Sequence, residues 1–189
     1  MAKKLFLIDV HTLTHFGINP GRAILIQHLP SWESPSVLET WALTCLLHDI
    51  GTTDKNRGAT FMSFEFYGGH LALSKLVEFG APRPQAELVC EAIIRHQDAG
   101  STGTIPRIGW LIQQATLFDN CGAFPSLVHR ETVESTSKAW PRLGWCDCFA
   151  GKVRQEIEAK PWCHTTVIEE DGKDFAEMIE ANDLMRPYE

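Results

Sequence analysis

The sequence predicts an all-α fold, a single helical bundle over residues 1–189. Apolar residues recur at helical spacing through most of the chain, while the period-two alternation of strands is weak. No internal repeat, low-complexity tract or Ser/Gly linker divides the chain. The length of 189 residues, with 44% hydrophobic and 22% charged residues, is typical of one globular domain. We therefore expect one folded unit.

The N-terminal stretch is expected to be the least regular part of the chain. Residues 5–10 are mostly apolar and compatible with an extended segment. Pro20 and Gly21 follow, and this pair favours an interruption of any regular element around residues 17–21.

The first clear helix is predicted to begin at Ser36, which forms an S-x-x-E capping box with Glu39. The helix ends at Gly51 and carries His48 and Asp49 on its last turn. Its apolar positions follow the pattern of one helix face and are Leu38, Trp41, Ala42, Cys45 and Leu46.

Six further helices are predicted from apolar periodicity and from the Gly and Pro residues between them. Gly80 and the prolines behind it end one helix, and Pro106 can open another. The expected ranges are 61–79, 84–97, 106–120, 131–139, 144–160 and 172–181.

Composition argues against several classes of protein. Lys and Arg number 17 and Asp and Glu 24, so the net charge of −7 disfavours a protein that binds nucleic acid through its phosphates. No run approaches the ~18 apolar residues of a membrane span, and the N-terminal apolar run is too short for a signal peptide. Six Cys residues without a Cys-x-x-Cys pair predict neither disulfides nor a cysteine metal site. We expect a cytoplasmic protein.

The adjacent pair His48-Asp49 is the sharpest chemical feature, since an imidazole nitrogen and a carboxylate oxygen both bind divalent metals. Taken alone, the pair also suits a helix-capping His beside a solvated Asp. Three other ionisable residues, His70, His96 and Asp119, lie on or at the ends of apolar helices, where an unpaired group is costly. Convergence of several of these groups on one metal ion explains the pattern.

Four sequence blocks resemble one known family in their residues and their order. They are TCLLHDIGTT at 44–53, SFEFYGG at 63–69, EAIIRHQD at 91–98 and ATLFDN at 115–120. Together they are similar to the fungal cyanamide hydratases, within the HD-domain metal-dependent hydrolases, and the similarity extends over residues 23–189. The resemblance implies a single HD domain that binds a divalent metal, zinc or alternatively iron, through His48, Asp49 and Asp119.

The N-terminal segment 1–22 departs from the family pattern. The family places a first ligand histidine upstream of Ala23, and ungapped counting puts Leu13 at that position. A small insertion or deletion would bring His11 or His15 into register as the fourth ligand. Alternatively, the segment is divergent and the site has three protein ligands. His70 also departs from the pattern and is expected to be packed or to support the site without binding the metal.

The resemblance implies hydration of cyanamide to urea, in which metal-bound hydroxide adds to the nitrile carbon. His96 is the first candidate for the proton donor, because imidazole exchanges protons near neutral pH. Glu65 is a candidate to hold the substrate amine or to orient the water, with an exposed surface carboxylate as the structural alternative. Thr116 lies one turn before Asp119 and can hydrogen-bond the substrate.

Substrate binding is assigned to three further residues. Phe66 is expected in an apolar pocket wall, Lys55 at the pocket lip, and Asp98 beside a histidine that it supports. Beyond the small-molecule substrate, a homo-oligomer is expected, with Trp140, Trp145 and Trp162 available for a subunit interface.

Two other functions remain open from the sequence. One is an HD-type nucleotide phosphohydrolase, which needs cations for phosphate oxygens; Lys55, Arg57 and Arg95 are available. Thr52 and Thr53, however, occupy the turn where many HD phosphodiesterases have a lysine, and they favour a small neutral substrate. The other is a catalytically degenerate helical binding protein.

Overall fold

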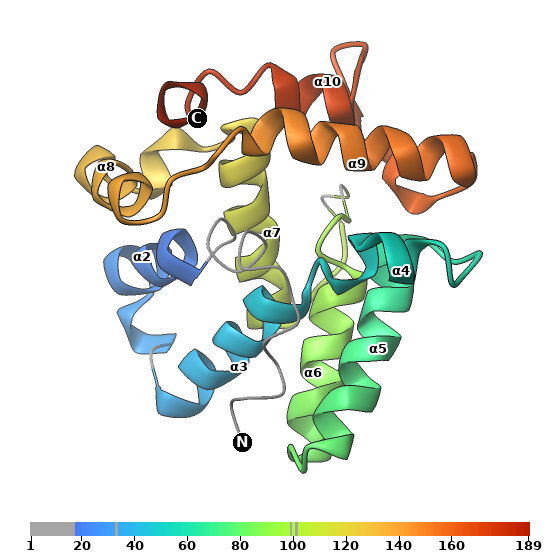
Figure 1. Ribbon diagram of the computed structural model, residues 1–189. Helices are drawn as coiled ribbons and strands as arrows, with labels where there is room; N and C mark the ends of the chain where they lie inside the picture. The colour runs from blue at the N-terminus through green and yellow to red at the C-terminus, as the bar shows by residue number, and fades with distance from the viewer. Residues whose placement is uncertain (1–17, 33, 99, 101) are drawn as a thin grey trace.

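Helices dominate the part of the chain that the computed structural model describes, residues 18–189 except 33, 99 and 101 (Figure 1). The all-α prediction is therefore confirmed. The helices are α2 (Ile18–His28), α3 (Pro35–Leu47), α4 (Asp54–Arg57), α5 (Phe64–Glu78), α6 (Arg83–Ile94), α7 (Arg107–Cys121), α8 (Arg130–Ala139), α9 (Trp145–Ala159) and α10 (Phe175–Glu180).

Short 3₁₀ helices and one hairpin connect these elements. The 3₁₀ helices are η2 (Pro30–Trp32), η3 (Ile50–Thr52), η4 (Pro125–Leu127), η5 (His164–Val167) and η6 (Arg186–Tyr188). Strands β1 (Glu169–Glu170) and β2 (Lys173–Asp174) pair antiparallel, with Glu169 opposite Asp174.

In the view of Figure 1, α2, α3, α5 and α6 form a lower group, and the C-terminal segment with α9 and α10 forms an upper layer. Helices α5 and α6 pack side by side, and α3 contacts both α6 and α7. Helix α7 runs upward through the molecule, while α9 lies across the top and packs against α10. Because α10 also contacts α7, the C-terminal end of α7 lies where the two groups meet.

Apolar side chains gather in three clusters that follow this arrangement. The largest joins α2, α3 and α7 around residues such as Trp41 and Phe118. A second joins α3, α5 and α6. The third joins α9 to α10 and includes Trp145 and Phe149, whose rings stack with centroids 5.2 Å apart. Trp145 is thus a core residue and not the interface residue we expected, whereas Trp140 and Trp162 are exposed.

The start of α3 differs from the predicted capping box. Ser34, and not Ser36, is the N-cap, and its side chain accepts a hydrogen bond from the Val37 backbone N–H. Pro35 explains the difference, because proline is preorganised for the first helical position and makes the residue before it the cap. Ser36 therefore lies inside the first turn.

The predicted interruption at Pro20 is wrong, since α2 begins at Ile18 and passes through Pro20 to His28. Proline in the first turn costs no helical hydrogen bond, because the first four N–H groups of a helix have no partner within it.

Four predicted helices also differ at one end. Helix α3 ends at Leu47 instead of Gly51, so Asp49 follows the helix and does not lie on its last turn. Helix α6 ends at Ile94 instead of residue 97, so His96 follows it.

The other two helices begin later than predicted. Helix α5 begins at Phe64 instead of residue 61. Residues 172–174 belong to a hairpin turn and strand, and α10 begins only at Phe175, after a capping box formed by Asp174 and Glu177. The capping box fixes the start of α10, because each of the two side chains bonds the other's backbone N–H.

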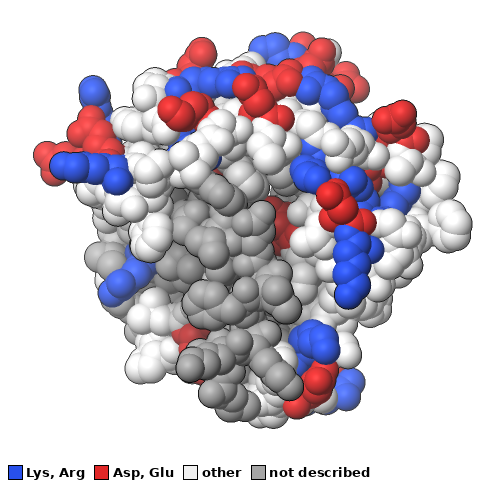
Figure 2. Space-filling model, in the orientation of Figure 1, with Lys and Arg blue, Asp and Glu red and all other residues white. Residues whose placement is uncertain are grey.

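None of the described helices is long and apolar enough to cross a membrane. On the face shown in Figure 2, Lys and Arg side chains are interspersed with Asp and Glu, most densely over the upper layer. The ion pairs made by α9 include Arg154–Glu180 and Arg186–Asp147. The six cysteines form no disulfide, and Cys45 and Cys90 are buried.

Candidate metal centre

His48 is fixed in place by the end of α3. It is the C-cap residue of that helix, and its ring is fully buried. Nδ1 lies 2.9 Å from the Cys45 carbonyl oxygen, and since a carbonyl only accepts, Nδ1 carries the proton. Nε2 lies 3.3 Å from Oδ2 of Asp49. Burial lowers the pKa of His48, but the Asp49 carboxylate more than offsets this and raises it.

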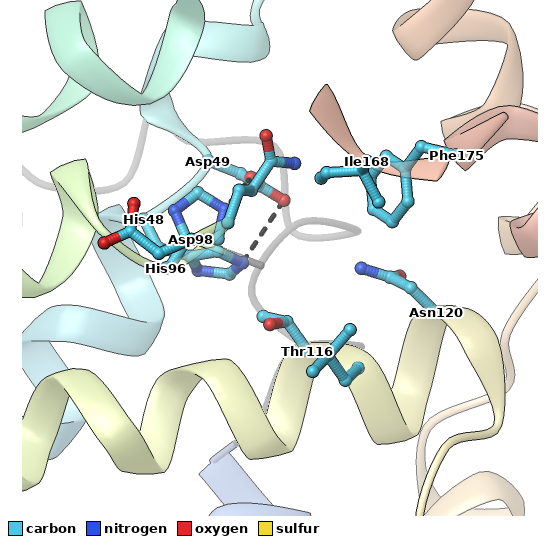
Figure 3. A pocket seen from close by; sticks show the side chains of 10 residues that line it. His48, Asp49, His96, Asp98, Thr116, Asn120, Ile168 and Phe175 are labelled. Carbon is cyan, nitrogen blue, oxygen red and sulfur yellow. Dashed lines mark ion pairs between the residues drawn. The ribbon is translucent and has the colours of Figure 1, made fainter. Parts of the chain in front are cut away.

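His96 repeats this arrangement at the end of α6. Its Nδ1 donates to the Ile93 carbonyl at 2.7 Å, and its Nε2 lies 3.9 Å from Oδ1 of Asp49 (Figure 3). The rings of His48 and His96 meet edge to face with centroids 5.3 Å apart. Burial, and then the nearby His48, lower the pKa of His96. Asp49 therefore lies between two imidazoles that both direct Nε2 toward it.

Asp49 is a buried carboxylate whose oxygens have no hydrogen-bond donor in the described part of the chain except Nε2 of His48, which pairs with Oδ2 when the imidazole is protonated. Burial raises its pKa, but His48 outweighs this effect and the pKa is lowered. A buried ionised carboxylate without donors is costly unless a cation compensates it.

The chain after Asp49 is held tightly against α5. A Cβ atom at Gly51 would lie 2.0 Å from the backbone oxygen of Phe64. Only glycine therefore permits this approach of η3 to α5, which places the His48-Asp49 turn beside the N-terminus of α5.

Asp119 lies on α7 and is also buried. Its Oδ1 accepts a hydrogen bond from Nη1 of Arg142 at 2.6 Å, whereas its Oδ2 has no hydrogen-bond partner in the described part of the chain. Burial raises the pKa of Asp119, and Arg142 offsets this only in part. Asp119 is close enough to His48 for their charges to interact, but it lines a separate small cavity beside Arg142.

The donor chemistry of His48, Asp49 and Asp119 fits a divalent cation, because both carboxylates have buried oxygens that lack a partner. Within residues 18–189, leaving aside 33, 99 and 101, no three His, Cys, Asp or Glu side chains stand together as a ready metal cage. Asp119 is held toward Arg142, which explains part of this separation. Leu13 and the two histidines proposed as a fourth ligand, His11 and His15, lie outside the described residues.

A small cavity of about 40 Å³ opens beside Asp49 (Figure 3). A water molecule needs roughly 10–15 Å³ measured in this way, so the space suits a molecule of a few atoms. The walls come from the ends of α3 and α6, from α7, from the residue before β1 and from the start of α10. The lining residues are His48, Asp49, His96, Gln97, Asp98, Thr116, Leu117, Asn120, Ile168 and Phe175.

Helix α7 presents two polar side chains to this cavity. The Thr116 hydroxyl donates to the Ile112 carbonyl at 2.9 Å, so its oxygen remains available as an acceptor. The Asn120 oxygen accepts from Nε1 of Trp145 at 3.2 Å, and in Figure 3 the Asn120 amide nitrogen points into the cavity. Sequence reasoning missed Asn120, because an asparagine at this position is also typical of a helix end without a role in a site.

Asp98 also lines the cavity. We expected it to support a histidine, but its carboxylate pairs with Nε of Arg95 at 2.8 Å. Lys55 instead lies exposed on α4 and is not among the residues that line the cavity. Thr53 caps α4 by accepting from the Asn56 N–H, and this short helix leaves Lys55 facing solvent. His70, expected to be packed, is exposed on α5.

Glu65 is fully buried, so the alternative of an exposed surface carboxylate is wrong. Its Oε1 accepts from Nδ1 of His164 at 2.9 Å, and Phe66 stacks on the His164 ring at 5.3 Å. Neither Glu65 nor Phe66 lines the cavity. The charge of Glu65 nevertheless acts on His96, so this carboxylate lies near the cavity without lining it.

Sequence reasoning missed the residues that pair with the side chains of Glu65 and Asp119. His164 lies in η5, 99 residues from Glu65, and Arg142 lies between α8 and α9, 23 residues from Asp119. Neither residue belongs to an apolar periodic segment. Identifying them would have required knowing which residues far apart in the sequence are in contact.

Comparison with known proteins finds two close relatives. The chain is 44% identical over 161 residues to the cyanamide hydratases DDI2 and DDI3 of Saccharomyces cerevisiae, and this match covers 85% of the chain and 69% of each relative. No family model matches the chain.

Proposed function

This chain belongs to the cyanamide hydratase family, and we propose that it is a hydro-lyase that adds water to cyanamide to give urea in the cavity beside Asp49. The observation that carries this proposal is a cavity of about 40 Å³ bounded by His48, Asp49 and His96. Such a space suits cyanamide, which has three heavy atoms, and is far smaller than the roughly 300–1,000 Å³ of sites for larger ligands.

We further propose that the chain is an HD-domain protein in which His48, Asp49 and Asp119 hold zinc, or alternatively iron. The unpartnered oxygens of Asp49 and Asp119 support this assignment. When bound there, a divalent cation lowers the pKa of water toward ~7 and supplies hydroxide at neutral pH.

His96 is the residue assigned to move the proton. Its Nδ1 already donates to the Ile93 carbonyl, so the neutral ring presents an acceptor at Nε2 inside the cavity. Nε2 can take the proton that water loses and return it to the nitrile nitrogen, which becomes negative as the new C–O bond forms. The isourea formed in this way becomes urea when its hydroxyl proton moves to that nitrogen.

Other cavity residues orient the substrate and restrict water. The Asn120 amide nitrogen can donate to the developing negative charge on the nitrile nitrogen, and the Thr116 oxygen can accept from the substrate amine. Ile168 and Phe175 form the apolar wall opposite α7 (Figure 3). Glu65 does not touch the substrate and acts indirectly, because its charge favours the protonated form of His96.

The positions of the Lys and Arg side chains disfavour the alternative of a nucleotide phosphohydrolase. Arg57 pairs with Asp54, and Arg95 pairs with both Asp98 and Glu91. Lys55 lies outside the cavity. Phosphate oxygens would need cations that are available at the reacting centre.

The test combines metal analysis with two activity assays on the full chain. We expect stoichiometric zinc or iron after dialysis, urea formation from cyanamide, and no phosphate release from a panel of nucleotides. Phosphate release without urea formation would favour the phosphohydrolase. A chain with neither metal nor activity would favour a degenerate binding protein.

Two ligand variants sharpen this test. His48→Ala and Asp49→Ala should each abolish metal retention and urea formation, because each loses one of only three or four ligands. The exposed His70→Ala variant is the matched control and should keep both. Metal retained at the wild-type level in either ligand variant would contradict the assignment.

A further inference from the structure

Three residues from the C-terminal half of the chain hold the end of α7. Nδ2 of Asn182 donates to the Asp119 carbonyl at 2.8 Å, and Nε1 of Trp145 donates to the Asn120 side chain at 3.2 Å. Nη1 of Arg142 donates to Oδ1 of Asp119 at 2.6 Å. Of these three, only Arg142 contacts the side chain of a proposed metal ligand.

Arg142 is itself held in one orientation. Its side chain is 2% exposed, and its Nε donates to Oε1 of Glu189 at 3.0 Å. Its Nη2 lies 3.4 Å from the Asp119 carbonyl oxygen and 3.7 Å from Sγ of Cys146. Glu189 is fixed in turn by the Cys146 backbone N–H at 3.4 Å. The guanidinium group therefore has a contact at each of its three nitrogens.

This contact makes the two oxygens of the Asp119 carboxylate different from each other. Oδ1 is committed to Arg142, whereas the buried Oδ2 has no hydrogen-bond partner in the described part of the chain. A carboxylate that binds a metal through one oxygen is commonly held by a hydrogen bond on the other. Asp119 matches this arrangement, since one oxygen is bonded and the other is buried without a hydrogen-bond partner in the described residues.

We propose that Arg142 is a positioning residue for the metal centre, which holds Asp119 by Oδ1 so that Oδ2 is presented to the cation as a single-oxygen ligand. This inference rests on the proposed function, since it takes Asp119 to be a ligand. Glu189 contributes indirectly by holding the guanidinium group.

The chemistry of arginine suits this task better than that of lysine. A planar guanidinium group can contact Asp119, Glu189 and the Asp119 backbone at once, in fixed directions. An ammonium group is a point charge and cannot reproduce all of these contacts. The charge also compensates the buried Asp119 carboxylate, so the residue contributes to folding as well as to the metal site.

The experiment must separate the effect on the metal from the effect on folding. Zn²⁺ affinity is measured by competition with a chelator, and the melting temperature is measured for the metal-free and the zinc-loaded full chain. Binding to the native state alone raises the melting temperature, so the zinc-induced rise reports the site, and the metal-free value reports the fold.

Arg142→Gln should weaken Zn²⁺ binding by about 10–100-fold, the usual effect of removing a group that supports a metal ligand, and should reduce the zinc-induced rise in melting temperature. Arg142→Lys should fall between this variant and the wild type. Arg154→Gln is the matched control, since Arg154 pairs with Glu180 at the exposed surface; it should bind Zn²⁺ as the wild type does.

Glu189→Gln keeps the inference testable if the Arg142 variants do not fold. It leaves the Arg142–Asp119 contact in place and weakens only the support behind it, so a several-fold loss of Zn²⁺ affinity is expected. Unchanged affinity in the folded Arg142 variants, or in Glu189→Gln if those do not fold, would overturn the proposal while leaving the metal centre intact. A wild-type chain that binds no Zn²⁺ would instead overturn the metal centre, and the proposal with it.

Discussion

The ring orientations of His48 and His96 are set in the same way, by the backbone of the helix that ends at each residue. Each ring uses Nδ1 to bond the carbonyl oxygen three residues earlier, and each directs Nε2 toward Asp49. The tautomer of both rings is thus set by the helix ends that carry them. The two residues differ in role because His48 is a proposed ligand, whereas His96 is proposed to move a proton.

His96→Gln separates these two roles. It should reduce kcat for urea formation by about 10²–10⁴-fold, the usual contribution of a positioned acid or base, while metal content stays at the wild-type level. The measurements are steady-state kinetics and metal analysis of the same sample. Loss of the metal from this variant would show that His96 is a ligand and would leave the proton without an assigned carrier.

Asp119→Asn tests the distant ligand. A carboxamide oxygen can still coordinate but lacks the charge, so metal affinity should fall less than in Asp49→Ala. Arg142 would also lose the partner carboxylate of its ion pair. Chelator competition measures the affinity, and unchanged affinity together with unchanged turnover would require the distant carboxylate to be another residue.

The sequence could predict which residues surround the cavity only where they lie on periodic helices. Asp49 and His96 were predicted because each lies near the end of an apolar helical stripe, and Thr116 because it lies one turn before Asp119. All three line the cavity. Glu65 was named, but its partner His164 lies 99 residues away on a 3₁₀ turn. Contacts of this kind depend on tertiary packing and leave no periodic signal.

At the scale of elements, the N-terminus of α5 depends on α9. The Phe64 backbone N–H donates to Oε1 of Glu156 at 2.8 Å, which in turn lies 3.2 Å from Nζ of Lys160. Nζ also donates to the Met62 carbonyl at 2.7 Å. The sequence placed both helices approximately, but it could not show that a side chain of α9 caps α5, which is why the predicted start of α5 was three residues early.

Lys160→Met should destabilise the fold strongly, by about 3–5 kcal/mol, because breaking a buried ion pair leaves an uncompensated charge. Glu156 would be that charge, and burial already raises its pKa while Lys160 lowers it. Urea denaturation measures the free energy of unfolding. Lys152→Met, which removes a partly exposed lysine paired with the exposed Asp54, is the control and should change stability little. A similarly small loss in Lys160→Met would show that the pair contributes nothing to docking α9 on α5.

At the scale of the whole molecule, the His164–Glu65 pair joins the upper layer to α5 and should make stability depend on pH. The hydrogen bond to Glu65 raises the pKa of His164, burial opposes this, and the charge of Asp98 adds to the increase. The folded-state pKa therefore exceeds the unfolded value of about 6.5. The stabilisation is fully present below that unfolded value and is lost as the pH rises through the folded pKa.

The measurement is the free energy of unfolding between about pH 5.5 and 8.5, a range chosen to span the histidine titration. Wild-type stability should decline toward the alkaline end, and Glu65→Gln should reduce this decline because it removes the carboxylate that raises the pKa. His70→Gln, at an exposed position of the same helix, should keep the wild-type profile. An identical decline in Glu65→Gln would assign the pH dependence to another group.

The cavity is assembled from segments spread along the chain, and this distribution has a consequence for biosynthesis. His48 and Asp49 leave the ribosome early and Asp119 later, followed by Arg142, whereas the wall residues Ile168 and Phe175 emerge after all of them. Chains are synthesised from the N-terminus, so a nascent chain that ends before Arg142 carries His48, Asp49 and Asp119 without the wall or the arginine. Durable metal loading is therefore expected only after the upper layer has been translated and has docked on α7.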